Sequence, residues 1–103
     1  MSDYAADITK YTNSVDADAV NAIVKYCGIA LQKRDSALVS TSDTKELITV
    51  RDGFAAKKLR LAPEAADAGI KVVLDKMKAE RAKSRVTFYY LLAEATGTLG
   101  ALR

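Results

Sequence analysis

Apolar residues recur at helical spacing along most of the 103-residue chain and divide it into five segments. The spacing predicts a short helix over residues 3–11 and a second helix that starts after Asp16, a good N-cap residue, and extends to Lys33. The second helix is apolar around most of its circumference, which indicates neighbours on two sides. Residues 35–39 could form one further helical turn before a polar loop.

Three more helices are predicted in the second half of the chain. Asp43 followed by Glu46 resembles a capping box for a helix over residues 44–59, in which Gly53 marks either a break or a close helix crossing. Pro63 suits the first turn of a fourth helix, whose apolar positions line up as far as Ser84. Ser84 is a plausible cap for a fifth helix that ends at Gly97.

The fifth helix carries apolar side chains on all sides: Val86, Phe88, Tyr89, Tyr90, Leu91, Leu92, Ala93 and Ala95. A helix that is apolar all round is normally buried all round. A strand alternative exists for residues 47–50 and 86–90, but both are flanked by helix formers and neither has a hairpin partner. We therefore predict one all-α domain over residues 1–103, a compact bundle of about five helices whose C-terminal helix is largely buried.

The composition narrows the function classes. At 50% hydrophobic and 28% charged, with one proline and five glycines, the chain fits neither a disordered segment nor an all-β fold. It has no histidine and one cysteine, which removes imidazole-based catalysis and most metal sites. We predict no catalytic residue, no metal and no cofactor, and a protein that is not an enzyme. Without a long apolar stretch or a basic-then-apolar leader, we expect no membrane span and a cytoplasmic location.

Two smaller features have structural explanations. Cys27 falls on the apolar face of the second helix, where a buried thiol has a raised pKa and is inert. Asp67, Lys71 and Asp75 follow each other at intervals of four, a spacing typical of solvent-exposed helix pairs.

Basic residues gather in the second half of the chain and could meet an anionic partner. The candidate surface consists of Lys57, Lys58, Arg60, Lys78, Arg81 and Arg85. Cations at a helix C-terminus also interact favourably with the helix dipole, which explains Lys78, Arg81 and Arg85, around the end of the fourth helix, without any ligand. Weak nucleic-acid binding is therefore the alternative function, and it requires that these side chains form one continuous face.

The aromatic run Phe88, Tyr89 and Tyr90 is open to two interpretations. These side chains could form the core of the domain, or part of the fifth helix could close against a partner protein or a second copy of the chain, because interface cores are rich in Tyr and Phe. The preferred hypothesis is a non-enzymatic protein-interaction module, with a homodimer as one form it could take, and with these three residues at its interface.

Three stretches of the chain also carry a family resemblance: residues 23–26 (IVKY), 50–54 (VRDGF) and 83–94 (KSRVTFYYLLAE). Over nearly its whole length the chain resembles a family of small bacterial proteins known only as a domain of unknown function. The resemblance implies a bacterial, cytoplasmic, helical domain, and it supplies no functional position.

Overall fold

The computed structural model describes residues 8–12, 15–28, 38–39, 44–78 and 83–101. In chain order its elements are helix α2 (Ala17–Cys27), strand β1 (Leu38–Val39), helix α3 (Thr44–Thr49), π-helix η2 (Val50–Lys58), helix α4 (Pro63–Lys76), strand β2 (Lys83–Ser84), helix α5 (Arg85–Ala95) and 3₁₀-helix η3 (Leu99–Ala101). The all-α prediction is confirmed, since the only strands in the described residues are two of two residues each.

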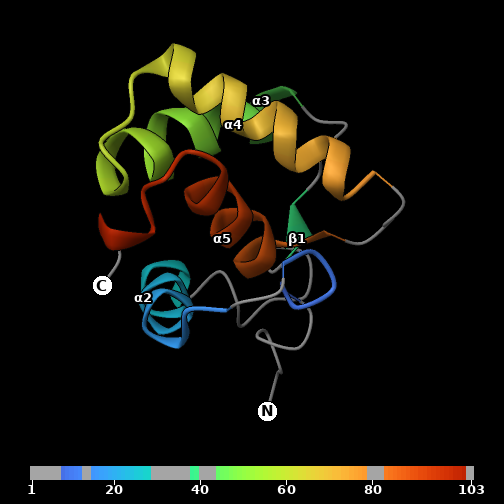
Figure 1. The fold of residues 1–103 in the computed structure, drawn as a ribbon. Helices are drawn as coiled ribbons and strands as arrows, with labels where there is room; N and C mark the ends of the chain where they lie inside the picture. Colours follow the sequence, from blue (N-terminus) through green and yellow to red (C-terminus); the bar gives the residue numbers. More distant parts are fainter. Residues whose placement is uncertain (1–7, 13–14, 29–37, 40–43, 79–82, 102–103) are drawn as a thin grey trace.

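Helix α5 lies at the centre of the fold (Figure 1). Helix α2 packs against one side of it and α4 against another, and η2 packs beside α4. Strands β1 and β2 pair antiparallel just before α5, with Leu38 opposite Ser84 and Val39 opposite Lys83. The prediction of a helical turn over residues 35–39 is therefore wrong at Leu38 and Val39, and residues 35–37 lie outside the described part. Most of the predicted first helix, residues 3–11, lies outside it too.

The start of α2 follows from its capping residue. The Asp16 side chain accepts hydrogen bonds from the backbone N–H groups of Asp18, at 3.1 Å, and Ala19, at 3.2 Å, which satisfies two donors that the first turn leaves unpaired. The helix ends at Gly28, whose φ of 40° breaks the helical path. The prediction that this helix continues to Lys33 is therefore wrong at Gly28, and residues 29–33 lie outside the described part.

Helix α4 begins at Pro63 as predicted, because the first helical position needs no backbone donor. It ends at Lys76 and not near Ser84, since Met77 leaves the helical region with φ −102° and ψ 10°. Helix α5 starts directly after Ser84, and the chain turns away at Gly97, whose φ is 70°. Residues 47–50 and 86–90 are helical, so the strand alternative for both is wrong.

The two helical glycines play different parts. Gly53 neither breaks its segment nor marks a close crossing: it lies inside η2, and a Cβ there would sit an ordinary 4.0 Å from the Tyr26 hydroxyl. The close crossing is at Gly69 of α4, where a Cβ would lie 2.6 Å from Thr96 Cγ2 and 2.8 Å from Leu92 Cδ1. A side chain at position 69 would force the Thr96 and Leu92 side chains to shift, so glycine suits this close approach of α4 to α5.

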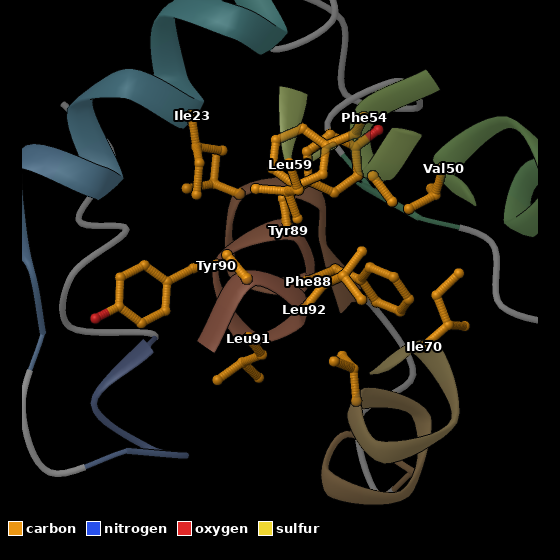
Figure 2. Close-up of a cluster of buried hydrophobic side chains, with 14 of the residues drawn as sticks. Ile23, Val50, Phe54, Leu59, Ile70, Phe88, Tyr89, Tyr90, Leu91 and Leu92 are labelled. Atoms are coloured by element: carbon orange, nitrogen blue, oxygen red, sulfur yellow. The ribbon is translucent and has the colours of Figure 1, made fainter. Parts of the chain in front are cut away.

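The core is organised around α5, in which every side chain from Val86 to Ala93 is buried. Figure 2 shows the side chains of residues 88–92 pointing outward from α5 in different directions, among residues of α2, η2 and α4. The ring of Tyr89 stacks on Phe54 of η2 with centroids 4.2 Å apart. The Tyr90 hydroxyl accepts a 2.8 Å hydrogen bond from the backbone N–H of Asp16, so the buried phenol is satisfied. The predicted burial of the C-terminal helix is confirmed.

Candidate functional site

The aromatic run predicted as an interface lies inside the chain's own core. Phe88 and Tyr90 are 0% exposed and Tyr89 is 5% exposed. A partner could touch these rings only if α5 left its place among α2, η2 and α4. The core interpretation of Phe88, Tyr89 and Tyr90 therefore fits the structure, and the interface interpretation does not.

The basic residues do not form one surface in the described part of the chain. Lys57, Lys58 and Arg60 precede α4, and Lys78 follows it. A helix of 14 residues separates the two groups by about 21 Å at about 1.5 Å per residue. Arg81 lies outside the described residues.

Arg85, near Lys78 in the sequence, is engaged within the fold. Its Nη1 donates to the Tyr89 hydroxyl at 2.9 Å, and its guanidinium carbon lies 5.7 Å from the centre of the same ring. Exposed arginine available to phosphates would point away from the protein instead. This geometry gives no specific support to the nucleic-acid alternative.

A hollow that the sequence pattern did not predict lies between α3, the start of η2 and α4. It has a volume of about 380 Å³, and its lining comes from Leu47, Ile48, Arg51, Asp67, Ile70, Lys71 and Leu74. We call it the α3–α4 groove. Among these lining residues Ile70 is buried, Leu47 and Leu74 are half-buried, and Ile48 is 42% exposed. The groove is therefore a solvent-accessible, mainly aliphatic surface that also contains a few charged groups.

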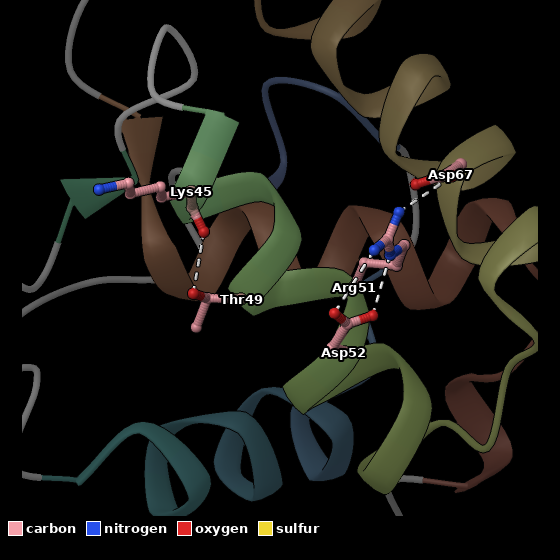
Figure 3. A network of polar contacts seen from close by, with 5 residues as sticks. All are labelled: Lys45, Thr49, Arg51, Asp52 and Asp67. Carbon is pink, nitrogen blue, oxygen red and sulfur yellow. Dashed lines mark hydrogen bonds and ion pairs between the residues drawn. The ribbon is translucent and has the colours of Figure 1, made fainter.

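Arg51, one of the lining residues of the groove, extends from η2 toward Asp67 of α4 (Figure 3). Its Nε donates to Asp52 Oδ1 at 2.9 Å, and its Nη1 lies 3.5 Å from Asp67 Oδ2 on α4. The hydrogen bond from Arg51 lowers the pKa of the Asp52 carboxyl and raises the pKa of the Arg51 guanidinium. Arg51 is therefore shared between two carboxylates and ties the two walls of the groove together.

Lys71 is in a different situation on the same wall. It is exposed, and it forms no ion pair or hydrogen bond with any residue that the structure describes. The two acids one turn away along α4 are bound to other cations: Asp67 to Arg51, and Asp75 to Lys78 Nζ at 3.8 Å. The prediction from their spacing that Lys71 pairs with Asp67 and Asp75 is therefore wrong.

A second, shallower hollow of about 270 Å³ lies on the other flank of α4. Its lining consists mostly of small side chains, with Val72, 45% exposed, as its large exposed apolar residue. It contains no charged residue. Val72 and Ile48 therefore form a matched pair of exposed aliphatic residues on opposite flanks of α4, one beside charged groups and one not.

The described residues contain neither a metal-binding cluster nor a membrane-spanning helix. No three cysteine, aspartate or glutamate side chains of that part gather as a metal site would require. None of its helices combines the length and the apolar character needed to cross a bilayer. The side chain of Cys27 lies outside what the structure describes.

Comparison with known proteins supplies a family and no activity. The model of a family described as "Protein of unknown function (DUF2853)" matches residues 3–100, nearly the full chain. This match confirms the resemblance to a family of unknown function. A search of curated proteins gives no match.

Proposed function

The chain belongs to the DUF2853 family, and we propose that it is a non-enzymatic protein-interaction module that binds a helix of another protein in the α3–α4 groove. The observation that carries the proposal is the aliphatic lining of that groove, left open to water beside charged side chains. Amphipathic helices bind such grooves by inserting apolar side chains spaced one turn apart.

The groove has dimensions that suit a few side chains of a helix. Its lining extends over more than one helical turn of α4, from Asp67 to Leu74, and over one turn of α3 and η2, from Leu47 to Arg51. Full burial of an aliphatic side chain contributes about 1.5–3 kcal/mol, and Ile48 still has 42% of its surface to bury. Ile48 alone then contributes about 1 kcal/mol, which indicates a modest affinity spread over several contacts.

A second copy of the chain fits this groove less well than a foreign helix. The large apolar side chains exposed in the described part are Tyr26, Ile48 and Val72, and they come from three different helices. None of those helices displays two of them one turn apart, as a groove-bound helix must. The homodimer hypothesis also loses its original basis, because α5 is enclosed by the chain's own elements.

The proposal is tested by NMR titration of the isotope-labelled chain with a synthetic helical peptide of about 18 residues, long enough to be partly helical alone. The peptide carries leucines at positions i, i+4 and i+7. We expect shifts confined to residues of the groove. Ile48→Gln should weaken binding about fivefold, whereas the control Val72→Gln, equally exposed on the other flank, should leave it within about twofold.

Two results would overturn the proposal. One is the absence of shifts in the groove at millimolar peptide; the other is an equal loss of binding in both variants. Sedimentation of the free chain tests whether a second copy of the chain occupies the groove. A dimer that forms with rising concentration and is lost in Ile48→Gln would show that the groove binds a second copy and not a helix of another protein.

A further inference from the structure

We infer that Lys71 makes the α3–α4 groove selective for helices that carry a carboxylate beside their apolar side chains. This inference rests on the proposed function and adds the charge of the partner. It depends on which charged groups of the groove are already paired and which one is not.

Two of the three charged lining residues satisfy each other. Arg51 and Asp67 approach to 3.5 Å, and Arg51 also holds Asp52 at 2.9 Å. A helix that covers the groove can leave this network intact, because each of its charges keeps a partner of opposite sign. Arg51 and Asp67 therefore do not favour a partner helix of either charge.

Lys71, in contrast, favours a partner helix of negative charge. It has no ion pair in the described part of the chain, and its nearest acids along α4 are held by Arg51 and by Lys78. In the free protein water solvates its ammonium group. A helix laid over the groove removes part of that water, and an ammonium group that loses water without gaining a partner opposes binding.

A carboxylate on the partner, on the flank of its apolar stripe, replaces the lost water at Lys71 Nζ. An ammonium or guanidinium group at the same place would be repelled. Lys71 lines the groove together with Ile70 and Leu74, so its aliphatic stem can contact the apolar side chains of the partner while its charged end meets the carboxylate. The groove therefore recognises apolar residues and a negative charge together.

The test uses two peptides of about 18 residues that share the same leucine stripe and differ only on its flanks, which carry glutamate in one and lysine in the other. Affinities are measured by fluorescence anisotropy at low salt for the natural chain, for Lys71→Glu and for Lys57→Glu. Lys57 is exposed on η2 and does not line the groove, so its variant changes the net charge equally at a distance from the site.

The natural chain and Lys57→Glu should prefer the acidic peptide about fivefold or more, and Lys71→Glu should prefer the basic one. The preference should shrink as salt rises. Equal binding of both peptides to the natural chain, or the same preference in Lys71→Glu, overturns the inference while leaving the groove as a helix site. Failure of both peptides to bind any of the three chains overturns the proposed function with it.

Discussion

The close crossing of α4 and α5 makes Gly69 a position where one added methyl group should destabilise the fold. In Gly69→Ala the new Cβ would lie 2.6 Å from Thr96 Cγ2 and 2.8 Å from Leu92 Cδ1, closer than real Cβ atoms approach other heavy atoms. Leu92 is held by its core packing, since it is 0% exposed, and Thr96, which borders the second hollow, is held by its hydroxyl, which donates to Leu92 O at 2.9 Å.

The magnitude follows from two opposing effects. Overpacking of a filled interior costs about 1–3 kcal/mol, and alanine in place of glycine within a helix returns about 0.5–1 kcal/mol. We expect a net loss of about 1 kcal/mol, which lowers the Tm of a domain of this size by about 4–8 °C. Thermal unfolding followed by circular dichroism, with urea unfolding at 25 °C for the free energy, measures both quantities.

Two further variants isolate the cause. Thr96→Ser removes Cγ2 and keeps the hydroxyl, so it should cost less in the Gly69→Ala background than in the natural chain. Gly53→Ala, with only the Tyr26 hydroxyl at 4.0 Å from the new Cβ, should be as stable as the natural chain or more stable. If Gly69→Ala proved as stable as Gly53→Ala, the account of the α4–α5 crossing would be refuted.

Two other predictions concern single polar groups. Asp16→Ala leaves the backbone donors of Asp18 and Ala19 without their cap and should destabilise the chain by about 1 kcal/mol in urea unfolding, whereas Asp16→Asn should retain most of that stability. The pKa of Asp52 should lie below its ordinary 3.8, because Arg51 stabilises the carboxylate. The ion pair therefore stabilises the fold above that value and is lost as pH falls through the folded-state pKa. A carbon-detected NMR titration should find the pKa restored in Arg51→Gln, and an unchanged pKa would contradict the pairing.

Features that depend on neighbouring residues in the chain were predictable from the sequence. The cap at Asp16 and the first turn at Pro63 depend on backbone groups within a few residues of each. The burial of α5 was predictable for a different reason, since a helix with apolar residues on every side has no polar face that could be exposed to solvent. These features establish the all-α class without knowledge of which helix meets which.

Features that depend on contacts between distant segments were not predictable. Residues 44–59 have one helical pattern, yet the helix widens into η2, where the Leu59 N–H donates to Phe54 O five residues back. Gly53 and Gly69 look alike in the sequence, and only the packing of α4 on α5 separates the one that is required from the one that is not.

The groove was missed for the same physical reason. The spacing of Asp67, Lys71 and Asp75 predicts pairs within α4, but a helix surface pattern does not reveal cations that arrive from elsewhere. Arg51 of η2 forms an ion pair with Asp67, and Lys71 is left without an ion-pair partner in the described part of the chain. The one available signal was Ile48, an aliphatic residue beside the apolar face of its helix and not on it.

The most apolar segment of a small domain is a poor place to look for its partner surface. A chain of 103 residues has little interior, and folding uses the richest apolar segment, α5, to build it. A partner can use only the apolar groups that remain outside, and their number here is small: Tyr26, Ile48 and Val72 among the described residues. Ile48 borders a hollow that also contains charged side chains, whereas the hollow beside Val72 contains none. The exposed apolar side chain and Lys71, which has no ion pair in the described part of the chain, therefore lie at one place, the α3–α4 groove, where we propose that a partner binds.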